Sequence, residues 1–150
     1  MDGLMQAEAI LRGTGLEIVR QGIGIAVPVG QKLTIMRGDI VRMNVSFDYR
    51  GIALTGLTLR CSIGQRVMVI GFDEIAFGQA SVDVAESIDF VGYTVFADID
   101  TSPIESGANY DIEAKIEEYV GDTLVSRDDV IDVIGAPEFT GFSIDSYDVV

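Results

Sequence analysis

The sequence predicts an all-β fold, a sandwich of two sheets, from two alternating stretches and from regularly spaced glycines. In Ser106–Val120, one face carries apolar residues and the other carries charged ones; the apolar face is Tyr110, Ile112, Ala114 and Ile116. Ile40–Tyr49 alternates in the same way. Period-two alternation is typical of a strand with one buried face and one exposed face. A regular series of glycines separates these segments, as expected of turns between short strands.

The composition indicates a single globular domain. The chain has 150 residues, of which 48% are hydrophobic, with 17 Gly and 3 Pro. This length suffices to bury a core, and the abundance of Ile and Val favours strands over helices. We expect an N-terminal arm or short helix in residues 1–15, a sandwich domain in residues 16–137, and a C-terminal strand or arm in residues 138–150.

The first half of the chain contains five expected strands, each apolar or alternating and most of them bounded by glycine: Leu16–Arg20, Ile23–Val29, Lys32–Met36, Asp39–Tyr49 and Leu57–Ile63. Alternation in the fifth strand places Leu59, Cys61 and Ile63 on one face. Cys61 is the only cysteine, so no intramolecular disulfide can form. We expect its thiol to be buried as a small apolar group.

The second half contains six further expected strands: Val67–Ile70, Ala80–Val84, Val91–Asp100, Asn109–Val120, Thr123–Ile134 and Gly141–Tyr147. The fourth and fifth of these should form a hairpin centred on Gly121 and Asp122. The last follows a Gly-Ala-Pro break. It is either an extra strand of its own sandwich, which we favour, or an arm that adds to a neighbour's sheet edge. We expect residues 1–15 to contact a partner.

The order of four segments, GDIVRMNVSFDYRG, TLRCSIG, GYTVFADID and SGANYDIEAKIEEYV, resembles the seven-stranded immunoglobulin-like modules of CARDB-type and filamin-like repeats. The resemblance covers residues 23–134. Tyr110, which follows the Gly107 turn, is similar to the tyrosine of a tyrosine corner. The chain departs from antibody domains because it has no Trp and no cysteine pair. Similar free-standing modules occur in virion proteins of tailed phages, so the resemblance implies an immunoglobulin-like β-sandwich with a structural role.

The charge is unevenly distributed along the chain, whose net charge is −14. Residues 1–66 hold eight Lys or Arg against five Asp or Glu, a net +3, whereas residues 67–150 hold two against nineteen, a net −17. This balance disfavours nucleic acid and anionic membranes as partners. The negative charge either keeps the protein soluble or drives head-to-tail assembly between a basic end and an acidic face.

The residues available for chemistry indicate a protein that is not an enzyme. There is no histidine, and Cys61 has no histidine partner, which removes the usual nucleophilic systems and zinc sites. Acidic pairs leave a small carboxylate-pair hydrolase as an alternative. Oxygen ligands on loops suffice for calcium, and the candidates are Asp98, Asp100 and Glu105. No other cofactor is expected.

Elimination and resemblance together predict a non-enzymatic structural protein that forms a homo-oligomer. We expect a phage virion component made in the host cytoplasm (decoration, head-fibre, tail or baseplate), with itself and other virion proteins as partners. The N-terminal residues carry no basic stretch followed by an apolar one, so we expect no secretory leader. The alternative is a cell-surface adhesion module that binds calcium or carbohydrate.

Overall fold

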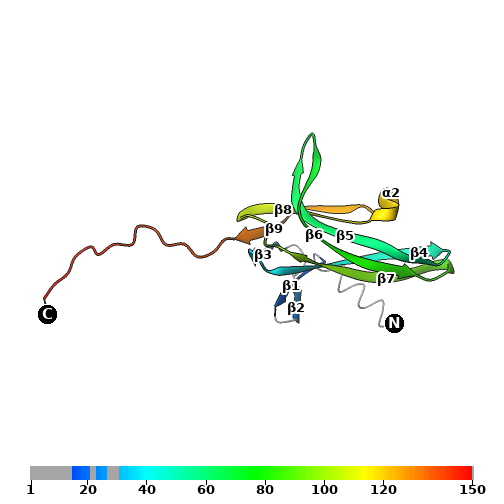
Figure 1. Cartoon of the computed structure of the whole chain (residues 1–150), viewed down its shortest axis with the longest axis horizontal. Coiled ribbons are helices and arrows are strands. Elements are labelled where there is room, and N and C mark those ends of the chain that lie inside the picture. The colour runs from blue at the N-terminus through cyan, green and yellow to red at the C-terminus, as the bar shows by residue number, and fades with distance from the viewer. Residues whose placement is uncertain (1–14, 21–22, 27–30, 150) are drawn as a thin grey trace.

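The computed structural model describes residues 15–20, 23–26 and 31–149, which form a sandwich of two β-sheets (Figure 1). The first sheet has four strands in the order β2-β1-β4-β7: β1 Leu16–Arg20, β2 Ile23–Ala26, β4 Ile40–Gly51 and β7 Ser87–Asp100. The second has five strands in the order β3-β9-β8-β5-β6: β3 Leu33–Met36, β5 Leu54–Val67, β6 Gly71–Val84, β8 Gly107–Ile116 and β9 Val125–Ile134. The all-β sandwich expected from the sequence is therefore confirmed.

Strand pairing is antiparallel except between β3 and β9, which run parallel. The inward faces of both sheets form one core, whose largest fully buried side chains are Leu16, Ile35, Val41, Leu59, Ile63, Ile99, Ile104 and Ile131. The alternating face of β8 lies in this core, because Tyr110, Ile112, Ala114 and Ile116 are all buried. Cys61 is buried as well, as its place in the alternation predicts.

Tyr110 fixes the entry to β8. Its hydroxyl donates a hydrogen bond to the backbone carbonyl of Glu105, five residues upstream, at 2.7 Å. This is the hydrogen bond by which a tyrosine corner ties a strand to the preceding loop. Asn109 adopts a left-handed conformation at φ 64°, and its side chain accepts a hydrogen bond from Lys32. The start of β8 is thus tied both to the preceding loop and to Lys32.

Three expected elements differ from the structure. Residues 68–70 form the turn of the β5–β6 hairpin, whose strands are much longer than expected. β8 and β9 pair as expected, but a 3-10 helix, η1 (Glu117–Tyr119), and a helical turn, α2 (Val120–Thr123), replace the tight hairpin turn. Residues 135–149 contain no strand and leave the sandwich as an extended tail (Figure 1). The expected strand Gly141–Tyr147 is therefore not formed in this structure, and whether the segment adds to a neighbour stays a prediction.

Other expectations fall on residues that the structure leaves undescribed. These are the short N-terminal helix, the arm in residues 1–15 apart from Gly15, and the end of the second expected strand beyond Ala26. They stay predictions. Within the described ranges, no helix has the length and apolar character needed to cross a membrane.

Folding interleaves the basic and acidic halves of the chain. Arginines of β4 and β5 pair with carboxylates of β6, β7 and β9 or of the segment after β8: Arg42 with Asp98, Arg60 with Glu74 and Glu117, and Arg66 with Asp128. Lys32 pairs in the same way with Asp132. These basic residues of the first half are therefore paired with acidic residues of the second half inside one sandwich. This pairing argues against assembly between a basic end and an acidic face.

Candidate functional site

One long side of the sandwich is closed and the other is open over half its length. On the closed side, the edge strands β6 and β7 lie against each other. On the other side, β1 pairs with β4 only from Ile40 to Met43, and β3 pairs with β9 only from Ile131 onward. Beyond those points no strand of the described chain covers the β4 edge or the facing edge of β9.

A groove runs along this open side, between the parts of β4 and β9 that no described strand covers. It has a larger lobe of about 360 Å³ and a smaller lobe of about 210 Å³, and the two share Val45, Ser46 and Val125. The larger lobe is lined by apolar side chains from both sheets, among them Phe47, Leu57, Leu59, Ile116 and Tyr119. We call this feature the open-side groove.

The alternation of β4 builds one wall of the open-side groove. Val41 and Met43 are buried beneath β1, whereas Val45, Phe47 and Tyr49 continue the same face past its end and are only half-buried. Phe47 stacks on Tyr93 of β7 with ring centroids 5.4 Å apart. Core-type residues thus line a surface that lacks the strand that would cover it.

The η1 and α2 segment closes the end of the larger lobe. The Thr123 hydroxyl accepts a hydrogen bond from the Ile116 backbone N–H at 2.9 Å and donates one to the Tyr119 carbonyl at 2.8 Å. Thr123 therefore holds this connection against β8, and Tyr119 and Asp122 come to line the lobe.

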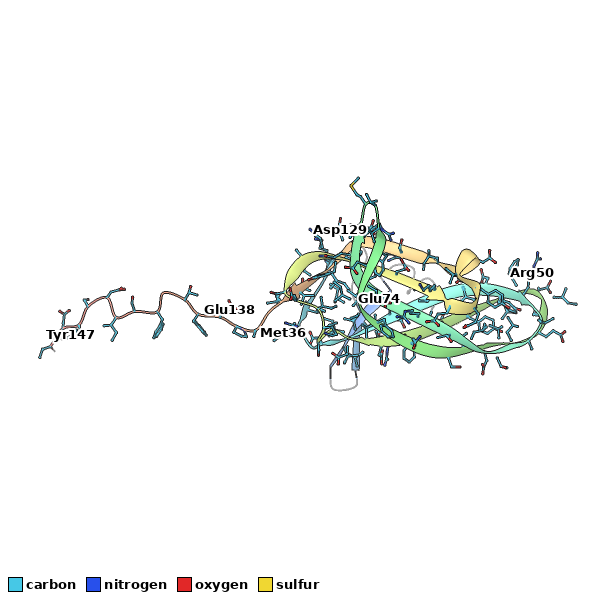
Figure 2. All side chains as sticks on the ribbon, turned by 45° about the horizontal axis from the view of Figure 1, so that its top comes forward. Met36, Arg50, Glu74, Asp129, Glu138 and Tyr147 are labelled. Atoms are coloured by element: carbon cyan, nitrogen blue, oxygen red, sulfur yellow. The ribbon has the colours of Figure 1, made fainter. Side chains whose placement is uncertain are left out.

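The C-terminal tail, residues 135–149, carries unburied apolar side chains. Five of them are at least 86% exposed: Phe139, Phe142, Ile144, Tyr147 and Val149. Figure 2 shows Glu138 and Tyr147 along the tail, at the opposite end of the molecule from Arg50. Phe142 and Ile144 are two residues apart and share one face of the extended chain.

The β5–β6 hairpin is a second projection from the sandwich. The pairing of β5 with β8 ends at Gly64, so the part of the hairpin beyond Gly64 stands away from the five-stranded sheet (Figure 1). At its tip, Met68, Val69 and Ile70 are at least 83% exposed. We call these residues the hairpin tip.

The buried carboxylate of Asp111 fixes the point at which the hairpin leaves the sheet. Its Oδ2 accepts a hydrogen bond from the Arg66 N–H at 2.6 Å, and its Oδ1 accepts one from the Asp129 N–H at 2.8 Å. Asp129 adopts a left-handed conformation at φ 57°, where the register of β9 shifts. One side chain thus satisfies the backbone groups of two strands that diverge at this point.

Exposed phenyl groups on the outer faces of the sheets differ from those of the tail, because arginines cover them. The guanidinium carbon of Arg60 lies 3.8 Å from the ring centre of Phe77, that of Arg42 lies 4.1 Å from Phe96, and that of Arg50 lies 4.4 Å from Phe90. Such cation–π contacts shield aromatic surface from water. Among the described residues, no arginine covers a ring of the tail in this way.

Two of the three calcium candidates, Asp98 and Asp100, are engaged by protein contacts. The third, Glu105, takes part through its backbone carbonyl, which accepts the hydrogen bond from Tyr110. Asp98 accepts hydrogen bonds from Arg42 at 2.9 and 3.1 Å. Asp100 accepts hydrogen bonds from the N–H and hydroxyl of Ser102, which hold the pKa of Asp100 below its usual value. No group of three acidic, histidine or cysteine side chains gathers within the described ranges. Calcium binding stays a prediction, and melting that responds to calcium more than to magnesium would test it.

The acidic pair Asp73-Glu74 lies at the base of the hairpin, where Glu74 is held by Arg60 at 2.6 Å and by a hydrogen bond from Ser62. The hydrogen bond from Arg60 is the main cause that lowers the pKa of Glu74 and raises that of Arg60. Burial alone raises the pKa of the Cys61 thiol to about 12, so this group is a thiol at neutral pH. Glu74 and Cys61 thus both have structural contacts within the five-stranded sheet: Glu74 through Arg60 and Ser62, and Cys61 through its burial in the core.

Comparison with known proteins gives no relative from which a function can be taken: no protein-family model matches the chain, and no curated protein matches its sequence. The open-side groove and the hairpin tip were both missed by sequence reasoning. The groove arises because β1 and β3 are 5 and 4 residues long, whereas β4 and β9 have 12 and 10. The unequal strand lengths could be read from the sequence. Which strands pair, and therefore which edges the short strands leave uncovered, could not.

Proposed function

We propose that this protein is a non-enzymatic structural module that associates with itself. The observation that carries the proposal is the exposure of the apolar side chains on the C-terminal tail, outside a sandwich whose own core is well formed. Five large apolar side chains on one extended segment are at least 86% exposed. Contiguous apolar surface of this kind is characteristic of protein interaction sites.

The charge supports association through apolar contact. The chain carries a net charge of −14, and its ion pairs join strands within one sandwich. Repulsion between copies keeps such a protein dispersed unless a specific contact offsets it. The apolar side chains of the tail and the hairpin tip supply surface for such a contact.

Within this class we propose a virion component of a tailed phage, in which many copies or neighbouring subunits provide the partners. The support is the resemblance of residues 23–134 to immunoglobulin-like modules of such proteins, together with the tyrosine hydrogen bond to Glu105. The sandwich itself hosts many unrelated functions, so the fold adds no further support.

Light scattering coupled to size-exclusion chromatography tests the proposal. We expect a mass above that of the 16.1 kDa chain, increasing with protein concentration through the micromolar range. A strict monomer up to millimolar concentration would overturn self-association. A further variant, Met68→Ser with Ile70→Ser, shows whether the hairpin tip contributes to self-association. Both positions are exposed, so these substitutions remove no side chain from the core.

A further inference from the structure

We infer that the C-terminal tail of one copy inserts as an added strand into the open-side groove of a neighbouring copy. This inference rests on the proposed self-association and names its contact. The segment involved is residues 138–149, and the groove is the gap between the edges of β4 and β9 that no strand of the described chain covers. The occupant is thus a second copy of this chain.

The groove has the features that a strand requires. Its floor is apolar and is made of the inward faces of both sheets, and its walls are strand edges. The described part of the segment that leads into β1 begins at Gly15. The Gly15 carbonyl accepts a hydrogen bond from the Asn44 N–H at 2.7 Å. Beyond Asn44, an added strand can pair with β4 by the same main-chain hydrogen bonds.

The tail has the features that the groove requires. As an added strand it would place Phe142 and Ile144 on one face and Ser143 and Asp145 on the other. An added strand placed antiparallel to β4, as β1 is, directs Phe142 into the larger lobe near Phe47. Ile144 then lies toward Val45 and the smaller lobe, while Asp145 faces solvent.

The direction of the added strand favours a neighbour over the tail's own groove. Val125 lines both lobes, whereas the tail leaves β9 after Ile134, at the other end of this strand. β9 is 10 residues long, so these ends lie about 30 Å apart. The eight residues from Gly135 to Phe142 reach at most about 29 Å from Ile134 when fully extended. Phe142 therefore cannot pass the larger lobe of its own chain and turn back antiparallel to β4, as the inferred orientation requires.

The positions of tail and groove determine the kind of assembly. The tail projects from one end of the sandwich, whereas β4 runs toward Arg50 at the other end (Figure 2). A tail that enters the next groove leaves its own groove open for a third copy. Such a contact is heterologous and gives a head-to-tail series that ends only if the rotation closes a ring.

Disulfide trapping tests the inference directly, using a chain that carries both Val45→Cys and Ile144→Cys. We expect a ladder of covalent dimers, trimers and longer species on a denaturing gel without reductant. Cys61 does not interfere, because it is buried and its thiol has a pKa of about 12. The matched control is Val45→Cys with Ser143→Cys, which places the tail thiol on the opposite face and is expected to give far less ladder.

A second measurement compares the masses of three variants by light scattering. Phe142→Ala with Ile144→Ala should weaken association about a hundredfold or more, since each buried side chain contributes substantially to affinity. Tyr147→Ala with Val149→Ala removes similar surface from the other face and should have less than a tenth of that effect. Removal of residues 138–150 should give a folded monomer with an unchanged circular dichroism spectrum in the strand region.

The outcomes separate this inference from the proposed function. An oligomer that persists without residues 138–150, or that is lost only when residues 1–14 are removed, overturns the tail contact and leaves self-association standing. An internal disulfide that leaves the double-cysteine chain monomeric shows the tail in its own groove, and this too overturns the inference. A wild-type chain that is monomeric throughout overturns the proposed function as well.

Discussion

Gly78 of β6 lies directly against the backbone of Asp98 in β7. A Cβ at position 78 would be 2.0 Å from the Asp98 carbonyl oxygen and 2.8 Å from its carbonyl carbon. These two strands are the edges of different sheets, so this contact is where the two sheets meet on the closed side. Asp98 is held in turn by Arg42 of β4, which joins the same region across the four-stranded sheet.

Gly78→Ala is therefore expected to lower the free energy of unfolding by about 3 kcal/mol, because backbone cannot move aside as a side chain can. Urea unfolding followed by circular dichroism measures the effect. Gly121→Ala is the matched control, since nothing lies within 4 Å of its added Cβ and the position is helical. The control should match the wild type or be slightly more stable. Equal losses at the two positions would contradict the close approach of β6 and β7.

The two faces of β8 should differ in their sensitivity to truncation. Ile112 is buried between the two sheets, so Ile112→Ala should lower the free energy of unfolding by about 2–4 kcal/mol. Glu113 points outward and has an ion pair with Lys115 at 3.7 Å, so Glu113→Ala should change stability by less than about 0.5 kcal/mol. Denaturant titration of both variants checks this, and similar losses would overturn the assignment of the faces.

Local periodicity predicted most of the strands because it reports which face of a strand is buried. Tyr110 and Ile112 belong to such a pattern, and both lie in the core. The expected strand Val67–Ile70 was wrong beyond Val67, because an apolar run looks alike in a strand and at an exposed turn. Only the end of the β5–β8 pairing at Gly64 shows that these residues leave the sheet.

The groove could not be predicted, because it depends on contacts between segments far apart in the chain. Val45 and Phe47 read as core residues in the sequence, and their alternation is unbroken from Val41. Whether they are covered depends on where β1 and β3 stop along their partners, which is a property of pairing and not of pattern. The same limit applies to Asp98 and Asp100, whose carboxylates were available in the sequence but are engaged in the fold by Arg42 and Ser102.

Glu74 should make stability depend on pH. Hydrogen bonding to Arg60 lowers the pKa of Glu74 from its ordinary value of 4.5, so its contribution is present above that pH. The contribution is lost as the pH falls through the lowered pKa of the folded state. Glu74→Gln should be less stable than the wild type by about 1 kcal/mol at pH 7, and the difference should shrink below about pH 4.5. Urea unfolding from pH 7 to pH 3 measures it, and a constant difference would contradict the ion pair.

Salt should act in the same direction on folding and on assembly. With a net charge of −14, screening of repulsion within one chain should raise the melting temperature by several degrees between about 0.01 and 0.5 M NaCl. Screening between copies should strengthen association over the same range, because the tail contact is apolar and the tail carries Glu138, Asp145 and Asp148 without a basic residue.

Assembly driven by ion pairs between a basic end and an acidic face would instead weaken as salt is added. Melting followed by circular dichroism and mass measured by light scattering, in the same NaCl series, separate the two mechanisms. The chain that lacks residues 138–150 is the control: its melting temperature should still rise with salt, while its mass should stay that of a monomer. A wild-type oligomer that dissociates in 0.5 M NaCl would exclude an apolar contact as the main source of association.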